Sequence, residues 1–451
     1  MRRILWFRRD LRIKDNPLLA LGGDVLPIFI FDTTILSSLH RDDRRITFIF
    51  SHLLHLKSEL KKIGLDLKLF YGDPQDIFDY LLAKEFDEVV ATGDYDAYAK
   101  QRDLEISLKV HFHYIHDSYI FKPDEVLKDD GTPYLVFTPY YKKARRHLKT
   151  KNIDEVFPKD STLVDAKYET LTSIKKDEAL EEHPVSLQTL GFKEAKLEII
   201  DPYEKLEIFQ TKIDAYKEQR DYLTSDITSG LSVDLRFGTM GVRELIRVLF
   251  QHKHLDIEPF LRQLIFRDFY ASLLYHMPHI EHENYKYGFN GVPDRKRFRL
   301  FCEAKTGVPI VDAGVRELLS TGTMHNRVRM VVASFFTKDL LLPWQWGEAF
   351  FAQHLLDYDK ASNILSWQWS AGTGVDPQPY FRIFNPYLQS KKFDKDGVYI
   401  KRYIPQLSAL SSQQLHNEAY LLEHSIKDYP KPIVGHKEAA TKAIACFKKT
   451  P

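Results

Sequence analysis

Cysteine is nearly absent from this sequence, and its scarcity excludes several classes of protein. Only Cys302 and Cys446 occur in 451 residues, too few for a disulfide framework or a four-cysteine iron–sulfur cluster. We therefore expect a reducing compartment, the cytoplasm. Histidines are more numerous, but pairs such as His111 and His113 lack cysteine or carboxylate partners at the spacing of a metal site. We expect no bound metal.

Long apolar runs and a large net charge are missing as well. No apolar stretch approaches the roughly 18 residues that span a bilayer, so we expect no membrane association. The charged N-terminus enters directly into a strand-like run, so we expect no signal peptide. The net charge is +1, yet residues 286–346 hold ten Lys/Arg against five Asp/Glu, most densely at Arg295-Lys-Arg297-Phe-Arg299. This segment is either a solvated loop or a rim that contacts phosphates.

The first 125 residues alternate strand-like and helical runs. The strand-like runs are Ile4–Phe7, Val25–Phe31, Leu65–Tyr71, Glu88–Ala91 and Val110–Ile115, and the helical ones are Arg44–Lys62, Pro74–Lys84 and Asp96–Leu108. Such alternation predicts a parallel sheet with helices on both faces, a Rossmann-like α/β domain over residues 1–125. No G-x-G-x-x-G follows a strand, so the usual dinucleotide fingerprint is missing.

The rest of the chain reads as a linker followed by helices. We expect an inter-domain linker at residues 126–201, because the composition from Lys149 to Lys196 is rich in Lys and Glu and weakly periodic. Residues 202–451 predict an all-α domain. Its clearest helical patterns are Val242–Gln251, Glu258–His276, Val311–Leu319, Asn326–Leu342 and Trp346–Leu356.

Polar and aromatic residues concentrate between Thr306 and Pro386. Two carboxylates, an amide and two tryptophans fall within thirteen residues, at Asp357, Asp359, Asn363, Trp367 and Trp369. Upstream, Asn326, Arg329 and Met330 are spaced i, i+3, i+4 and so share a helix face. The pattern predicts an aromatic-lined polar pocket in a helical domain, with ordinary core packing as the alternative.

Four runs in this region carry a family resemblance. They are Thr306-Gly-Val-Pro-Ile-Val-Asp312-Ala, His325-Asn-Arg-Val-Arg-Met330, the run from Asp357 to Trp369, and Pro379-Tyr-Phe-Arg-Ile-Phe-Asn-Pro386. In this order they closely resemble the flavin-binding domain of the DNA photolyase/cryptochrome family. The opening run Leu5-Trp-Phe-Arg-Arg-Asp-Leu-Arg12 is similar to the family's N-terminus. The closest similarity is to class I photolyases that act on cyclobutane pyrimidine dimers.

The resemblance implies FAD as the cofactor. Arg329 and Asp357 match an ion pair against the flavin ring, Asp357 and Asp359 match contacts to its pyrimidine edge and ribose, and Asn363 matches the residue facing N5. Further cofactor contacts are implied at Tyr216, Thr228, Ser229, Gly230, Leu231, Ser232, Arg267 and Asn326. Many relatives carry a basic residue at the position of Gly230.

The residues of the implied substrate pocket favour different lesions. Pyrimidine-dimer photolyases usually have Glu and Trp at the positions of Gln263 and Phe266, and glutamine there is also seen in relatives that repair the (6-4) lesion or act as photoreceptors. Asn326, Met330 and Trp369, in contrast, match the dimer-repair pocket. The DNA contacts implied or proposed are Arg220, Phe266, Arg327, Met330, Trp369 and Lys401.

The resemblance also implies an electron path and an antenna domain. Trp367 and Trp344 match two members of a tryptophan chain that passes electrons to the flavin. The third member is missing near Gly291, and Tyr285, Tyr287 or Trp346 are substitutes. The N-terminal domain is implied to hold a second chromophore. It is either a deazaflavin or a folate, although Ala99 stands where folate-binding relatives have a carboxylate.

The function implied is that of a deoxyribodipyrimidine photolyase, a carbon–carbon lyase. It would repair cyclobutane pyrimidine dimers in DNA by light-driven electron transfer from excited reduced FAD, and would work as a monomer in the cytoplasm on DNA that contains UV lesions. Two alternatives stay open at this point. One is a cryptochrome-like blue-light photoreceptor, and the other is a photolyase for the (6-4) photoproduct.

Overall fold

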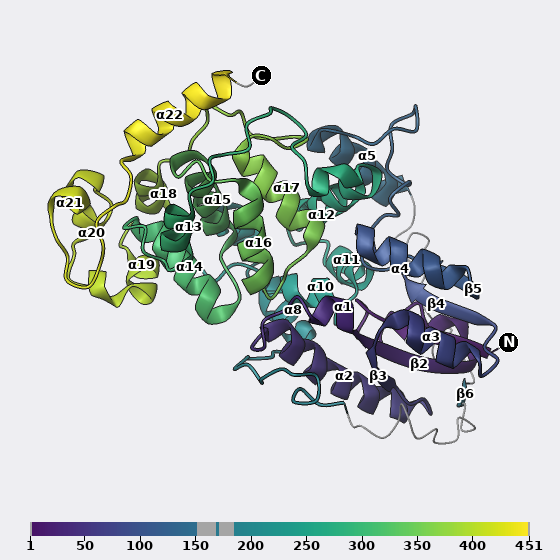
Figure 1. Ribbon diagram of the computed structural model, residues 1–451. Helices are drawn as coiled ribbons and strands as arrows, with labels where there is room; N and C mark the ends of the chain where they lie inside the picture. The colour runs from purple at the N-terminus through teal and green to yellow at the C-terminus, as the bar shows by residue number, and fades with distance from the viewer. Residues whose placement is uncertain (1, 151–167, 171–184, 450–451) are drawn as a thin grey trace. The chain divides into compact units, whose positions relative to one another are not determined.

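The computed structural model describes residues 2–150, 168–170 and 185–449 (Figure 1). The chain divides into two compact units. We call Met1–Pro133, Thr138–Thr211 and Ser229–His276 the α/β unit. We call Tyr134–Phe137, Lys212–Thr228 and Met277–Pro451 the helical unit. The domain limits drawn at residues 125 and 201 stay a prediction. No helix within the described residues is long and apolar enough to cross a membrane.

A parallel sheet forms the centre of the α/β unit, as predicted. Its strands are β1 (Arg2–Phe7), β2 (Gly23–Asp32), β3 (Lys68–Gly72), β4 (Glu88–Thr92) and β5 (His111–Ile115). They lie in the order β3-β2-β1-β4-β5, and a short β6 (Tyr168–Thr170) pairs with the start of β2. Every pairing is parallel, with Ile4 opposite Leu26 on one side and Val89 on the other. The predicted fold class is confirmed.

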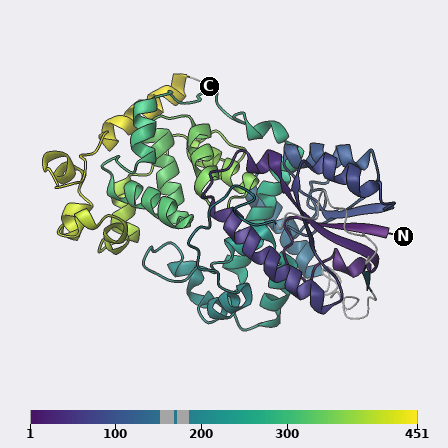
Figure 2. The ribbon, with the colours of Figure 1, turned by 60° about the horizontal axis from the view of Figure 1, so that its bottom comes forward.

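Helices cover both faces of this sheet, which explains why its central strands β1, β2 and β4 are largely buried. On one face, α3 (Pro74–Leu82) and α4 (Ala97–Ser107) bring Phe78 and Ile106 against Trp6 and Ile28. Helix α2 (Arg44–Lys62) lies on the opposite face (Figure 2). Aspartates at the N-caps of all three helices accept backbone N–H bonds, which sets where each helix begins.

Charged side chains meet at the carboxyl ends of β1 and β4, the point where the strand order reverses. Ligands of such sheets commonly bind at this point. Here Arg9, just after β1, pairs with Asp94, just after β4, at 2.8 Å. Arg8 pairs with Asp103 of α4 at 2.7 Å. These ion pairs thus connect the segments that follow β1 and β4 at this edge of the sheet.

The α/β unit also contains helices that follow the sheet in the chain. They are α1 (Thr33–Leu36), α5 (Phe137–Thr150), α8 (Pro202–Gln210), α10 (Ser232–Phe237), α11 (Val242–Gln251) and α12 (Glu258–His276). The last two have the predicted bounds. Helix α5 falls inside the segment predicted as a linker. Its buried Tyr140, Ala144 and Leu148 form an apolar stripe that a basic outer face masks in the sequence. Most of the Lys149–Lys196 segment lies outside the described residues.

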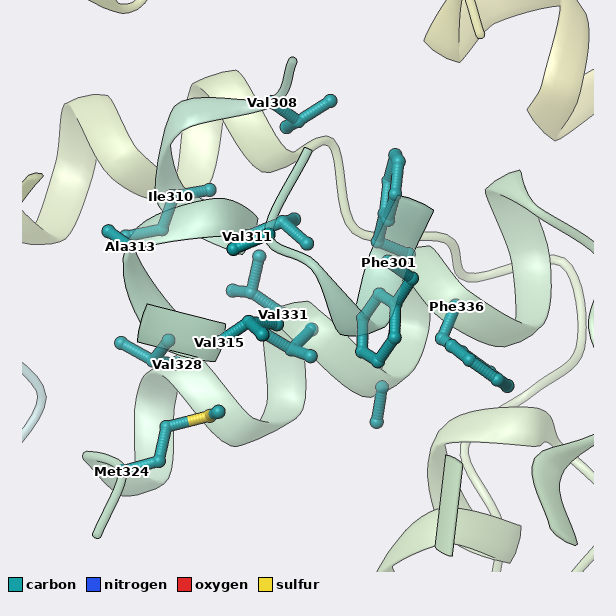
Figure 3. Packing of buried hydrophobic residues seen from close by; sticks show 14 of the residues in the cluster. Phe301, Val308, Ile310, Val311, Ala313, Val315, Met324, Val328, Val331 and Phe336 are labelled. Atoms are coloured by element: carbon teal, nitrogen blue, oxygen red, sulfur yellow. The ribbon is translucent and has the colours of Figure 1, made fainter. Parts of the chain in front are cut away.

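The helical unit packs around one apolar core. Its helices are α9 (Tyr216–Gln219), α13 (Arg295–Cys302), α14 (Pro309–Thr321), α15 (Asn326–Ser334), α16 (Trp344–His354), α17 (Lys360–Ala371), α18 (Pro386–Phe393), α19 (Val398–Tyr403), α20 (Ser412–Leu415), α21 (Glu418–Glu423) and α22 (His436–Lys449). Phe301, Val311, Val328 and Phe336 belong to this core, in which the Phe301 and Phe336 rings lie edge-on at 4.7 Å (Figure 3). A Cβ on Gly314 would lie 2.5 Å from Val328 Cγ1, so this glycine permits the close approach of α14 and α15.

The prediction of a single helix over Asn326–Leu342 is wrong. Helix α15 ends at Ser334, and Phe335–Asp339 form a π-helical turn in which the Leu340 N–H donates to Phe335 O. Leu341 then takes a positive φ of 56°. Pro343 disfavours helical backbone in the residue before it, which limits how far a helix can run. All five residues of the turn are buried, so no polar face in the sequence marks the change from an α-helical to a π-helical turn.

The first of the four family-like runs, residues 306–313, has a structural role. Asp312, fully buried, accepts N–H bonds from Thr306 and Gly307 at 2.9 Å each, and the Tyr429 hydroxyl donates to it at 2.7 Å. Gly307 has a φ of 75°, and a Cβ there would lie 2.3 Å from Lys431. Asp312 therefore fixes the start of α14 and the segment near Tyr429.

Candidate functional site

The start of α15 presents a polar face of the helical unit. His325 caps the helix, with its Nδ1 accepting the Arg327 N–H at 3.2 Å. Asn326 is exposed, and Met330, one helical turn later, is half-buried. Four residues apart on a helix, these side chains lie on the same face. The predicted pair thus shares a surface of α15 that is open to a ligand.

Arg329 forms the predicted ion pair with Asp357. Its Nη2 lies 2.9 and 3.1 Å from the two carboxylate oxygens, and its Nε donates to Met324 O at 2.7 Å. The Arg329 side chain is 28% exposed and that of Asp357 is 8% exposed. A guanidinium fixed on one side and open on the other can bind a polar ligand. Its contact with a flavin ring stays a prediction.

Helix α17 carries the remaining polar and aromatic candidates. Asp359 caps it by accepting the Ser362 N–H, while Trp369 is half-buried near its end. Asn363 is held by Glu348 of α16, because its Nδ2 donates to Glu348 Oε1 at 2.9 Å and to Glu348 O at 3.1 Å. Both amide hydrogens are therefore used, and Oδ1 is the atom left for a ligand.

Glu348 is a site residue that the sequence did not reveal. Burial raises the pKa of its carboxyl, and hydrogen bonds from Asn363 and Tyr358 act against that rise. A carboxylate four residues after Trp344 on a helix is a common surface pattern, so nothing marked it. Its partner Asn363, fifteen positions later, becomes its neighbour because α16 and α17 pack side by side.

The two candidate electron carriers are buried in the helical core. Trp367 is 2% exposed, and Phe336 and Phe351 lie edge-on to it at 5.3 and 4.9 Å. A Cβ on Gly347 would lie 2.2 Å from the Trp367 ring, so α16 approaches the ring at this glycine. Trp344 is 3% exposed, and its Nε1 donates to Asn284 Oδ1 at 2.7 Å.

Three aromatic residues are nearer the surface of the same unit. Trp346 is half-buried, with the Arg295 guanidinium 5.6 Å from its ring centre. Tyr287 is 37% exposed, and Tyr285 is half-buried. These are the substitutes predicted for the missing third tryptophan, and their role stays a prediction.

The predicted phosphate and ribose contacts are divided between the two units. Tyr216 is buried in the helical unit with the Arg220 guanidinium 5.5 Å from its ring centre, and Thr228 is exposed. Ser229, Gly230, Leu231 and Ser232 belong to the α/β unit. There the Ser229 hydroxyl accepts the Leu231 N–H at 3.3 Å, and Ser232 begins α10.

Helix α12 of the α/β unit carries the other predicted contacts. Gln263 and Phe266 are half-buried, and Phe266 lies edge-on to Tyr270 at 4.7 Å. Arg267 donates to Ser118 O at 2.6 Å and to Leu235 O at 3.1 Å. It thus ties α12 to α10 and to the loop after β5, while its contact with a flavin phosphate stays a prediction.

Asp268, beside Arg267, is a second residue that the sequence did not reveal. It is buried and accepts the Phe121 N–H at 2.9 Å. Burial raises its pKa to about 7. Its neighbours come from a loop more than a hundred positions earlier in the chain, so spacing alone could not identify it.

Two of the three cations proposed for phosphate contact lie near one another. Arg327 pairs with Asp221 at 2.6 Å, directly after Arg220, and stacks 4.4 Å from the centre of the Phe393 ring. Lys401 lies on α19, and none of its described contacts joins it to either arginine. Within the described residues, no group of three metal-binding side chains occurs.

Comparison with known proteins identifies the family. Two family models match, "DNA photolyase" over residues 3–159 and "FAD binding domain of DNA photolyase" over residues 260–449. A deoxyribodipyrimidine photo-lyase of Alkalihalophilus pseudofirmus is 34% identical over 483 residues, covering 98% of this chain and 97% of that protein. The chain belongs to the DNA photolyase family.

Solved photolyase structures resemble the whole chain. A bacterial class III photolyase from Agrobacterium tumefaciens is 31% identical with a TM-score of 0.82, covering 99% of this chain and 97% of that one. An archaeal photolyase from Sulfolobus tokodaii, solved with two FAD molecules, is 29% identical with a TM-score of 0.83 and full coverage of both chains. This chain is accordingly an enzyme of the photolyase class with FAD as its cofactor.

The described residues fit FAD on their own chemistry. Within the helical unit, Arg329 offers a half-exposed guanidinium and Asn363 offers Oδ1, the kinds of group that bind a flavin ring and tune its N5 edge. Asp357, which fixes Arg329, is 8% exposed. These residues would hold the ring, and the hydroxyls of Tyr216, Thr228, Ser229 and Ser232 are those predicted for the phosphates and ribose.

Proposed function

We propose that this photolyase repairs cyclobutane pyrimidine dimers in DNA in a light-driven reaction. The observation that carries the proposal is the pairing of α15 and α17, which pack against each other in the helical unit. One supplies Asn326 and Met330, and the other supplies Asn363 and Trp369. Bound FAD supplies light absorption and the electron that splits the dimer.

The protein's own part in the reaction is positioning. The Arg329–Asp357 pair and the Asn363–Glu348 pair hold their side chains before any ligand arrives, so no rearrangement is needed when it binds. Asn363 keeps Oδ1 available because Glu348 takes both amide hydrogens, and an acceptor there favours a protonated N5. The site is thus organised for a reduced ring.

A lesion inside a duplex must leave the base stack to reach such a site. Flipping costs a few kcal/mol, and least for a damaged base. Half-buried Met330 and Trp369 offer apolar and aromatic surface for the flipped bases, and exposed Asn326 offers an amide for their polar edges. Arg220, Arg327 and Lys401 are the proposed phosphate contacts, which would make binding depend on salt.

The choice of the cyclobutane dimer as the lesion rests on residues of the helical unit. Asn326, Met330 and Trp369 match the dimer-repair pocket, whereas Gln263 and Phe266 of α12 depart from it. Glutamine donates and accepts hydrogen bonds but cannot share a proton as glutamate can. These two residues favour the second candidate, repair of the (6-4) product. Glutamine at the position of Gln263 is also seen in photoreceptors, so a photoreceptor role is an equal alternative.

Electron supply and light harvesting complete the proposal. Trp367 and Trp344 are the inner carriers, and Tyr285, Tyr287 or Trp346 complete the path to solvent. We further propose a second chromophore in the α/β unit, either a deazaflavin or a folate. The enzyme is proposed to act as a monomer in the cytoplasm.

A repair assay with two lesions tests the proposal. Anaerobically reduced protein is mixed with one oligonucleotide carrying a thymine cyclobutane dimer and another carrying a (6-4) product, and each is illuminated with blue light beside a dark control. We expect light-dependent loss of the cyclobutane dimer alone. Loss of the (6-4) product alone would show that Gln263 and Phe266 outweigh Asn326 and Met330. Repair of neither lesion by flavin-loaded protein would favour a photoreceptor.

A further inference from the structure

Lys338 is the most unusual charged residue of the helical unit. It is fully buried, yet no carboxylate lies within ion-pair distance of it in the part of the chain that the structure describes. It belongs to the π-helical turn Phe335–Asp339. Buried lysines normally pair with an acid or lose their proton, and burial lowers the pKa of this one to about 7. Burying a lysine without an acidic partner destabilises the fold, which indicates that this residue has a function.

The ammonium group of Lys338 lies against segments that end α17, follow it or end the chain. Its Nζ donates to Tyr380 O at 3.4 Å and lies 3.7 Å from the centre of the Phe447 ring. A Cβ on Gly372 would lie 3.1 Å from the same nitrogen, so this glycine, at the C-cap of α17, leaves room for it. Lys338 thus links the end of α17, the loop beyond it and α22.

A second side chain of the same region reaches the same loop. The Ser334 hydroxyl accepts the Phe384 N–H at 3.3 Å, and Ser334 is as fully buried as Lys338. Asn326, Met330, Ser334 and Lys338 recur at every fourth position along α15 and the π-helical turn. Residues so spaced lie roughly along one side of a helix. The side proposed to meet the lesion therefore continues inward to two residues that bind the loop.

The loop itself presents two exposed side chains of complementary chemistry. Phe381 is 62% exposed, and Arg382 is exposed beside it. Aromatic rings stack on unpaired bases, and guanidinium groups bind phosphates. The loop follows α17 by only a few residues, so it leaves the helix that carries Trp369.

Few other hydrogen bonds hold this stretch of backbone. Within the described residues, Lys338 and Ser334 provide the hydrogen bonds that join Pro379–Phe384 to other elements; the Arg382 N–H bonds only to Pro379 O. Gln378, just before the stretch, is buried, but neither atom of its amide has a partner there. Apolar contacts add to these bonds: Tyr380 stacks on Phe447 at 5.6 Å and 7°, Tyr287 lies edge-on to Tyr380 at 5.7 Å, and Phe384 packs against the core of the helical unit.

We propose that Lys338 and Ser334 are positioning residues that fix the Pro379–Phe384 loop so that Phe381 and Arg382 meet damaged DNA. The inference rests on the proposed function, since it assumes that the ligand is lesion DNA. Neither residue touches the ligand. Each acts through the loop backbone, so its loss should weaken binding while the flavin site and the chemical step keep their properties.

Two substitutions and one control test the proposal in the flavin-loaded enzyme. Lys338→Met keeps length and removes the donor, and Ser334→Ala removes the acceptor with little change of volume. Lys442→Met makes the same chemical change at an exposed position of α22. The measurements are the Kd for a cyclobutane-dimer oligonucleotide, the repair rate at saturating DNA, the flavin content, and hydrogen exchange of the Phe384 amide.

We expect Lys338→Met to raise the Kd by up to about tenfold, the effect of losing one buried hydrogen bond, and Ser334→Ala to raise it less. Flavin content and the saturated repair rate should stay unchanged, and the Phe384 amide should exchange faster in Ser334→Ala. An unchanged Kd, or a loss of flavin in place of a loss of affinity, would overturn the inference. If exchange accelerates but the wild type has no preference for lesion DNA, the proposed function is wrong.

Discussion

Two buried cations, one in the α/β unit and one in the helical unit, have opposite surroundings. In the first, Arg12 and Asp117 are 4% and 2% exposed and share two hydrogen bonds of 2.7 and 2.8 Å. Burial raises the pKa of Asp117, but Arg12 and Arg243 bring it down to about 2. In the second unit, Lys338 is buried without a carboxylate in the described part of the chain, and the Arg329 of the candidate site is 28% exposed.

This difference distinguishes charged residues that stabilise the fold from charged residues that can bind a ligand or position a segment. A buried, fully paired carboxylate has no capacity left for a ligand, so the ion pairs of the α/β unit act on stability. A half-exposed guanidinium still has donors to offer, and a buried lysine bound only to backbone and ring positions the segment it touches. The comparison can be tested by removing one cation from each unit.

Arg12→Met should have the largest effect, on folding. It leaves Asp117 buried with only Arg243 as its partner, and breaking such a pair costs about 3–5 kcal/mol. We expect the free energy of unfolding, measured by urea titration, to fall by that amount. Arg41→Met, at an exposed arginine, should change it by less than about 0.5 kcal/mol.

The counterpart of this change in the helical unit is Arg329→Met. Its pair with Asp357 is partly screened by solvent, so the fold should lose no more than about 1 kcal/mol. Flavin should instead be lost during dialysis. If Arg329→Met unfolds the protein as readily as Arg12→Met does, the distinction between scaffold and site is wrong.

Gly347→Ala should rank second in its effect on stability. Its new Cβ would fall 2.2 Å from the Trp367 ring, and overpacking of this kind costs about 1–3 kcal/mol. The ring must move, so photoreduction of the bound flavin should slow as well. Gly435→Ala is the matched control, because nothing lies within 4 Å of the Cβ it would add. Equal thermal unfolding curves for both variants would contradict the packing described for α16 and α17.

Asn363→Asp tests the site without changing its shape. A carboxylate next to an anionic reduced flavin disfavours that form, so the flavin midpoint potential should fall by roughly 30–60 mV. Spectroelectrochemical titration measures the shift. Asn417→Asp, at a helix cap where both residues are equally suitable, should leave the potential unchanged. A potential that does not move in Asn363→Asp would remove this residue from the flavin site.

How much of this could be predicted from the sequence differs between the units. The strands from Ile4 to Ile115 and the helices α11 and α12 followed from apolar periodicity, because each is a local pattern. The Arg329–Asp357 pair followed from the resemblance. Glu348 and Lys338 did not, since Asn363 and Tyr380 reach them only through tertiary packing. The π-helical turn was not predicted because all five of its residues are buried, so no polar face marks the change of period.

A further expected effect is a dependence of stability on pH that comes from Lys338. Burial lowers its pKa from 10.5 to about 7 in the folded protein. Between these values the unfolded chain binds the extra proton, so the free energy of unfolding should rise with pH from about 7 upward. Urea titrations of wild type and Lys338→Met from pH 6 to pH 10 measure it. If the free energies of unfolding of the two proteins changed with pH in the same way, Lys338 would not titrate between pH 6 and pH 10.

The most direct test of the central claim is the emission of the reduced, flavin-loaded enzyme while a cyclobutane-dimer oligonucleotide is titrated in. If light drives an electron from the bound cofactor to the lesion, emission should be quenched in proportion to the fraction of sites occupied. An undamaged oligonucleotide of the same sequence should leave it unchanged. Saturated binding of the dimer without quenching would contradict the account, because the lesion would then be held where no electron reaches it.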